Sequence, residues 1–189
     1  MAASVMIVGV GGQGSLLASK LLGAVLVNEG YDVKVSEVHG MSQRGGSVET
    51  YVRFGDKVYS PIIAKGEADY ILSFEKLEAA RFSEYLKEGG EIIVNTQEID
   101  PMPVITGAAT YPENILEELK EKGVKIEDFD ALKVAKQAGS AKAVNIVLLA
   151  RLAKRFAISY DKWLEAIEKT VAPKFVEMNK KAFELGYNL

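Results

Sequence analysis

Residues 5–14 read VMIVGVGGQG, an apolar run of strand length that ends in a cluster of glycines. The apolar run at 5–10 predicts a strand that is buried on both faces of a parallel sheet. Residues 15–29, SLLASKLLGAVLVNE, are rich in leucine and alanine and stop before Gly30, so they predict a buried helix. Residues 33–38, VKVSEV, alternate apolar and polar side chains and predict the next strand. The chain therefore opens as strand, glycine turn, helix and strand.

Outward from this unit, the sequence predicts a three-layer, Rossmann-like α/β fold with a mixed, mostly parallel sheet and an antiparallel hairpin. The hairpin is expected where residues 47–54 and 57–59, two β-prone runs, meet at Gly55-Asp56. We expect the 189 residues to form one domain, with the helices from about residue 141 packed on it. Helices are expected at 75–87, 114–121, 131–137, 141–156, 159–170 and 173–186, and strands at 68–74, 91–95, 104–105 and 124–126.

The composition excludes several classes of function. The chain has no cysteine, which removes disulfides, thiolate zinc sites, cysteine nucleophiles and the usual ligands of iron–sulfur clusters. His39 is the only histidine, so histidine triads and multi-histidine metal sites are excluded as well. A net charge of −3 without a basic patch gives no support to a nucleic-acid partner. The first apolar run is interrupted by Gly9 and has no basic segment before it, so we expect a cytoplasmic protein with neither signal peptide nor membrane span.

Gly9, Gly11 and Gly14 satisfy the pattern G-x-G-x-x-G between a predicted strand and a predicted helix, where this pattern has mechanical meaning. Glycines let the backbone turn tightly and let a ligand approach, and the free N–H groups of a helix start favour an anion. Glu37 stands where a dinucleotide enzyme carries the acid that binds the ribose, which favours NAD(P) or FAD. The alternative is that the glycines only allow close packing of strand and helix. Gln13 can likewise contact a ligand or hydrogen-bond the neighbouring loop.

A second polar loop, HGMSQRGGS at residues 39–47, follows the second predicted strand. Loops at the carboxyl ends of neighbouring strands face the same crevice in a doubly wound sheet, so this loop is expected beside the glycine turn. Arg44 offers a planar fork of donors that suits phosphate or carboxylate. Its alternative role is an ion pair with an acidic residue of this chain or of a partner. Ser42 and Gln43 add further side chains that can hydrogen-bond a ligand.

Longer motifs resemble the gamma-type domain of 2-oxoacid:ferredoxin oxidoreductases. They are GVGGQG at 9–14, EVHGMSQRGGSVETYVRFG at 37–55, SPII at 60–63 with GEADYIL at 66–72, and EKLEAAR at 75–81. The similarity is strongest over residues 5 to 100 and continues through AGSAKAVNIVLLARL, where Gly139 and Asn145 stand at positions like those of the family. HGMSQRGG in register with GxGGQG is much more specific than the glycine pattern alone. The form that looks most similar is the separate beta subunit of indolepyruvate:ferredoxin oxidoreductases.

The resemblance implies an enzyme that oxidatively decarboxylates a 2-oxoacid, joins the acyl group to coenzyme A and passes two electrons to ferredoxin. Thiamine diphosphate and the iron–sulfur clusters are then expected in a large alpha subunit, in agreement with the lack here of cysteine and of a thiamine motif. This chain would complete the holoenzyme by covering its thiamine-bearing partner and helping to place coenzyme A, with no catalytic residue or metal ligand of its own. The candidate binding residues are Gly11, Gly12, Gln13, Gly14, Ser15, Ser42, Gln43 and Arg44.

Two other classes of function stay open on the sequence. One is a self-sufficient oxidoreductase that binds NAD(P) at the glycine turn and a ribose hydroxyl at Glu37. The glycine-broken loop and hairpin after Glu37 speak against it, because a simple dinucleotide fold would continue with another helical crossover. The other class is a structural assembly module whose glycine turn binds nothing.

Overall fold

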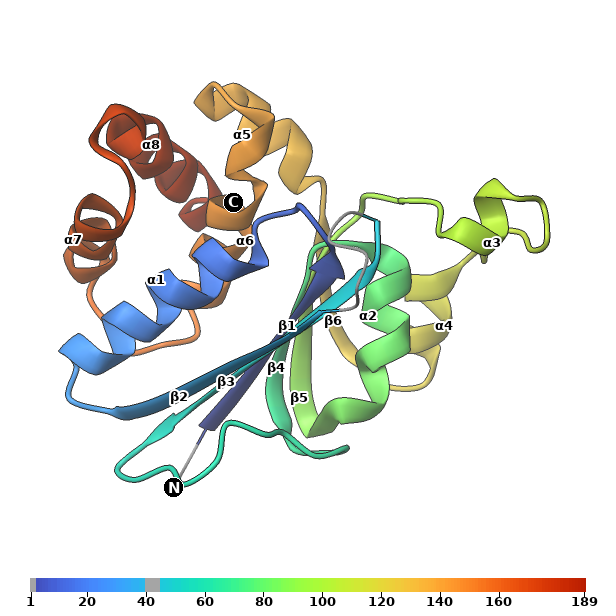
Figure 1. Cartoon of the computed structure of the whole chain (residues 1–189), viewed down its shortest axis with the longest axis horizontal. Helices are drawn as coiled ribbons and strands as arrows, with labels where there is room; N and C mark the ends of the chain where they lie inside the picture. The colour runs from blue at the N-terminus through green and yellow to red at the C-terminus, as the bar shows by residue number, and fades with distance from the viewer. Residues whose placement is uncertain (1–2, 40–44) are drawn as a thin grey trace.

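A mixed sheet forms the middle layer of the fold in the computed structural model, which describes residues 3–39 and 45–189 (Figure 1). Its strands are β1 (Ala3–Val10), β2 (Asp32–His39), β3 (Ser47–Gly55), β4 (Ala68–Ser73), β5 (Leu86–Asn95) and β6 (Lys125–Phe129). Within the described residues they lie in the order β2-β3-β1-β4-β5-β6. β1, β4, β5 and β6 run parallel, whereas β3 lies antiparallel between β1 and β2. The predicted mixed, mostly parallel sheet is therefore confirmed.

Helices cover both faces of this sheet (Figure 1). The central strand β1 needs two covered faces, because Val5 and Ile7 are buried in one core and Met6 and Val8 in the other. One face carries α1 (Ser15–Asn28), α5 (Ala131–Ala138), α6 (Val144–Ala153), α7 (Tyr160–Thr170) and α8 (Val176–Tyr187), and the other carries α2 (Lys76–Phe82) and α4 (Ile115–Glu121). Short 3-10 helices stand at Ser83–Tyr85, Ala141–Ala143 and Pro173–Phe175.

The predicted hairpin between residues 47–54 and 57–59 is wrong. β3 pairs instead with β2 on one side and with β1 on the other, and residues 57–59 form no strand. The physical reason is that β3 is an interior strand: both of its edges are already paired, and its side chains Val48, Val52 and Phe54 are buried under the covering layers. By contrast, Tyr59 is 84% exposed. The antiparallel hairpin exists, but it joins β2 to β3 through the second loop.

Three further elements differ from the expectation. The strand expected at 104–105 is a single helical turn, α3 (Met102–Ile105), which projects away from the sheet (Figure 1). Pro101 begins this turn, because its carbonyl accepts hydrogen bonds from the N–H groups of Val104 and Ile105 at 2.9 and 3.1 Å. The helix expected at 75–87 ends already at Phe82, and β5 starts five residues before the expected Glu91.

Candidate functional site

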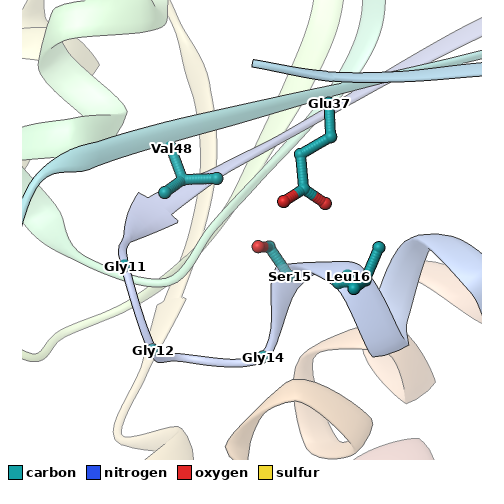
Figure 2. Close-up of a pocket in the computed structure, with 7 residues that line it drawn as sticks. All are labelled: Gly11, Gly12, Gly14, Ser15, Leu16, Glu37 and Val48. Atoms are coloured by element: carbon teal, nitrogen blue, oxygen red, sulfur yellow. The ribbon is translucent and has the colours of Figure 1, made fainter. Parts of the chain in front are cut away.

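The glycine turn lines a pocket of about 380 Å³ at the carboxyl end of β1 (Figure 2). The first turn of α1 forms one wall of this pocket, and β2 and β3 form the opposite wall. Four of the sequence-predicted binding residues come together here, namely Gly11, Gly12, Gly14 and Ser15. The lining also includes Leu16, Glu37 and Val48. The predicted turn is therefore the edge of a concave site, as a ligand-binding role requires.

Gly14 is held in a conformation that only glycine adopts easily. Its φ is 91°, in the left-handed region, and Gly12 has a similar φ of 100°. A Cβ atom added to Gly14 would also lie 2.7 Å from Nδ2 of Asn145, whereas one added to Gly12 would meet nothing within 4 Å. Glycine at position 14 is thus required by the backbone and by a neighbour, and at position 12 by the backbone alone.

The start of α1 offers backbone donors to the pocket. Gly14 is the N-cap residue, and its carbonyl accepts hydrogen bonds from the N–H groups of Leu17 and Ala18 at 3.1 and 3.3 Å. The N–H groups that precede these in the first turn have no partner inside the helix, by the geometry of any α-helix. Together with the positive end of the helix dipole, they favour an anionic group at the glycine turn.

Asn145 fixes this helix start from α6. Its side-chain Nδ2 donates to the Gly14 carbonyl at 3.2 Å, and its Oδ1 accepts from the N–H of Ile146 at 2.9 Å. The side chain is buried, so these hydrogen bonds are shielded from water. The resemblance had pointed to Asn145, but residue pattern alone gave it no role, because its contact is 131 positions away in the sequence.

Gln13 turns away from the pocket and braces the turn. Its Oε1 accepts from the N–H of Val10 at 2.7 Å, and its Nε2 donates to the carbonyl of Phe74 at 3.1 Å. The amide thereby ties the glycine turn to the end of β4. This geometry matches the alternative role of Gln13, a hydrogen bond to the neighbouring loop.

The end of the second loop lies directly beside the glycine turn, as predicted. The N–H of Gly11 donates to the carbonyl of Gly46 at 2.8 Å, and the next residues begin β3. Ser42, Gln43 and Arg44 fall outside the described residues, so their proposed contacts with a ligand stay predictions.

Glu37 gives the pocket an acidic wall. Its carboxylate reaches from β2 toward the hydroxyl of Ser15 at the start of α1 (Figure 2). A carboxylate repels an anion and attracts hydroxyl or amide donors. The pocket therefore suits a ligand that carries both an anionic group, for the glycine turn, and a hydrogen-bond donor, for Glu37. A phosphorylated ribose combines these groups.

No metal centre is found in the described part of the chain, where no three His, Asp or Glu side chains are grouped as ligands. No helix among the described residues has the length and apolar character needed to cross a membrane.

Replacing Gln13 by alanine is expected to lower the thermal midpoint of the isolated chain by about 3–6 °C. The change removes the acceptor of the Val10 N–H and one of the two donors to the Phe74 carbonyl, which keeps Nδ2 of Asn95. We expect this loss to cost about 1.5 kcal/mol. Differential scanning calorimetry without any ligand measures this shift. Ser15→Ala, which removes a hydroxyl that faces the pocket, is the control and should stay within about 2 °C of the parent chain. An unchanged midpoint for Gln13→Ala would argue that the amide braces nothing and is available to a ligand.

Comparison with known proteins identifies relatives along nearly the whole chain. The family model described as pyruvate ferredoxin/flavodoxin oxidoreductase matches residues 4–189. A protein of Pyrococcus horikoshii named indolepyruvate oxidoreductase subunit IorB is 48% identical, and its namesake in Thermococcus kodakarensis is 46% identical. Each similarity covers 97% of this chain and 93% of the relative.

A solved structure has the same fold. It is the 2-oxoglutarate:ferredoxin oxidoreductase of Magnetococcus marinus, solved with 2-oxoglutarate, coenzyme A and succinyl-CoA bound. The TM-score is 0.76 at 19% sequence identity, and the similarity covers 99% of this chain and 30% of that chain. At this identity the likeness concerns the fold, which also occurs as one part of a much longer chain.

Proposed function

The chain belongs to the pyruvate ferredoxin/flavodoxin oxidoreductase family, and we propose that it is the small, cluster-free subunit of an indolepyruvate:ferredoxin oxidoreductase. One observation carries the proposal: relatives that share almost half of its residues over nearly their full length bear the name of that subunit. The complete enzyme, which we place in the cytoplasm, would oxidatively decarboxylate an aryl 2-oxoacid, form its acyl-CoA and reduce ferredoxin.

The redox cofactors are assigned to a partner because the residues of this chain do not fit them. Iron–sulfur clusters are normally bound by cysteine thiolates, and the chain contains none. The described residues offer no cluster of acidic or histidine ligands for a metal such as the one that binds diphosphate. We therefore assign thiamine diphosphate and the iron–sulfur clusters to a large alpha subunit, which also sees the 2-oxoacid and passes electrons to ferredoxin.

Coenzyme A is the ligand that we propose for the glycine-turn pocket. Its phosphates suit the start of α1, and its ribose hydroxyl suits the carboxylate of Glu37. In this arrangement the chain itself performs no proton or electron transfer. It binds and orients the acyl acceptor at the thiamine site of the partner. The residues proposed for this surface are Gly11, Gly12, Gly14 and Ser15 with Ser42, Gln43 and Arg44, and Gln13 as their brace.

Co-expression with a candidate large subunit from the same organism tests the assignment. We expect the two chains to co-purify and to catalyse, under anaerobic conditions, a dye or ferredoxin reduction that depends on indolepyruvate and on coenzyme A. Activity of the large subunit alone at the same rate would contradict the role proposed here.

A nicotinamide cofactor is the competing ligand, because Glu37 also suits the ribose of NAD. Titration of the isolated chain with NADH, followed through the fluorescence of the NADH, tests whether this cofactor binds in place of coenzyme A. Binding of NADH by a chain that forms no complex with a large subunit would replace the proposed function by that of a dinucleotide-dependent oxidoreductase.

Arg44→Ala is expected to lower the activity or the assembly of the holoenzyme by about tenfold or more, while the isolated chain stays folded. A guanidinium that binds phosphate or a partner carboxylate contributes about 1.5–3 kcal/mol through charged hydrogen bonds. Activity of the purified complex and near-UV circular dichroism of the subunit measure the two effects. Arg44→Lys keeps the charge and loses the planar fork, so the activity of its complex should lie between that of the parent and that of Arg44→Ala. Full activity of the Arg44→Ala complex would count against any role of the second loop.

A further inference from the structure

Two carboxylates are buried at the start of α2, outside the pocket. Glu75 is 1% exposed and Glu78 is 3% exposed. A buried carboxylate is costly unless hydrogen bonds and opposite charge compensate for the lost water. For Glu78, burial raises the pKa of the carboxyl, while the hydroxyl of Ser47 and the guanidinium of Arg81 act in the opposite direction. The function proposed above gives neither carboxylate a role.

The contacts of Glu78 lead to the glycine turn. Its carboxylate accepts a hydrogen bond from the hydroxyl of Ser47 and, at 3.0 Å, from Nη1 of Arg81. Ser47 is the first residue of β3, and the carbonyl of the residue before it, Gly46, accepts from the N–H of Gly11 at 2.8 Å. Two hydrogen bonds, joined by the peptide unit between Gly46 and Ser47, therefore connect the buried carboxylate of Glu78 to Gly11 in the wall of the pocket.

Glu75 makes a different set of contacts. Its carboxylate accepts from the hydroxyl of Tyr111, from the N–H of Ile99 at 3.1 Å and from the N–H of Glu78 at 2.9 Å. Tyr111 and Ile99 stand at the two ends of the segment that carries α3. Glu75 thus holds the base of the projecting segment, whereas Glu78 contacts Ser47 at the end of the second loop.

We propose that Glu78 is a positioning residue for the glycine turn: it fixes Ser47, and through Gly46 it sets where the N–H of Gly11 stands at the pocket wall. Glu78 touches no ligand in this role. Packing at this position would be satisfied by an apolar side chain, which would spare the cost of a buried charge. The carboxylate matters because it is the acceptor that the hydroxyl of Ser47 needs at a defined place.

Hydrogen exchange in the full-length, ¹⁵N-labelled chain tests the link without any ligand or partner. Glu78→Ala is expected to speed exchange of the Gly11 amide about 3- to 10-fold, the effect of weakening one hydrogen bond. Ser47→Ala should do the same, and the double variant should add little, because both changes break one chain of contacts. Tyr111→Phe, which removes a hydroxyl from the neighbouring Glu75, is the matched control and should leave Gly11 unchanged.

Glu78→Gln keeps an acceptor oxygen for Ser47 and should restore slow exchange at Gly11. If Glu78→Ala does not fold, Ser47→Ala and Glu78→Gln still decide the question. Unchanged exchange of Gly11 in Ser47→Ala, or additive effects in the double variant, would overturn the proposal.

The catalytic consequence rests on the proposed function and is measured separately. In the assembled enzyme, Ser47→Ala should raise the KM for coenzyme A about 3- to 10-fold with kcat nearly unchanged, since the turn is misplaced and no reacting group is lost. Faster exchange at Gly11 together with an unchanged KM would support the positioning link and refute coenzyme A as the ligand of this pocket. Slow exchange together with a raised KM would refute the link and leave the ligand assignment standing.

Discussion

Replacing Gly186 by alanine is expected to lower the midpoint of thermal unfolding by about 6–12 °C. A Cβ atom at this position in α8 would lie 2.6 Å from the carbonyl oxygen and 3.0 Å from Cα of Val147, and 3.1 Å from Cβ of Ala150. The first two are backbone atoms of α6, so no side chain can swing away and the two helices must move apart. We expect this overpacking to cost about 3 kcal/mol, at the upper end for added methyl groups in a close-packed interior.

Gly23→Ala is the matched control, because Gly23 also lies within a helix. Its added Cβ would meet only Cγ2 of Val35, at an ordinary contact distance of 3.8 Å. Alanine is favoured over glycine inside helices by about 1 kcal/mol, so the midpoint should rise by about 2–4 °C. Differential scanning calorimetry of both variants gives the comparison. Equal shifts in the two variants would mean that contact between α6 and α8 is looser than the structure has it.

Local sequence signals predicted the opening unit well, because each of its elements is encoded by its own residues. The apolar run of β1, the glycine turn and the leucine-rich α1 lie within a few residues of where they were expected. Gly30 follows the C-cap of α1 with a φ of 87°, which is the conformation that a terminating glycine supplies.

The position of β3 was not predictable in the same way, because it depends on contacts between distant residues. β-propensity marks residues 47–54 as a strand but does not say which strands lie beside it. Its two neighbours, β1 and β2, satisfy the backbone hydrogen-bonding groups on its two edges. The short run at 57–59 buries only the side chain of Val58, whose N–H donates to the carboxylate of Asp32 and not to the backbone of a strand, and the run is a loop.

The candidate site was predicted in its backbone and less well in its side chains. A glycine turn between strand and helix has one geometry, so the pattern alone located the pocket. The direction of the Gln13 amide depends on the carbonyl of Phe74, which is 61 positions away in the sequence. The hydrogen bond from Asn145 to the Gly14 carbonyl depends in the same way on how α6 packs against the start of α1. Glu37 was noted only for a dinucleotide, yet it lines the pocket whichever ligand binds there.

With coenzyme A as the proposed ligand of the glycine-turn pocket, Gly14→Ala should lower kcat/KM for coenzyme A in the complex with the proposed large subunit by about 10- to 150-fold. Alanine at a φ of 91° costs about 1–2 kcal/mol in backbone strain, and its Cβ would meet Nδ2 of Asn145 at 2.7 Å. Relief of this contact requires the start of α1 to shift. A shift that loses one hydrogen bond between a helix N–H and a phosphate costs about 1.5–3 kcal/mol, which corresponds to this range of rates.

Gly30→Ala separates the effect on the pocket from the effect of strain, since the two glycines flank the same helix. Gly30 has a φ of 87°, and an added Cβ there would meet nothing within 4 Å. Its alanine variant should therefore lose about 1–2 kcal/mol of stability, or about 2–8 °C, and keep its dependence on coenzyme A. Initial rates at varied coenzyme A, measured for both variants well below their thermal midpoints, make the comparison. If Gly30→Ala loses activity as strongly as Gly14→Ala, instability explains both losses and the glycine turn has no special part in binding. If Gly14→Ala alone loses activity, the result supports binding of the acyl acceptor in the pocket at the start of α1.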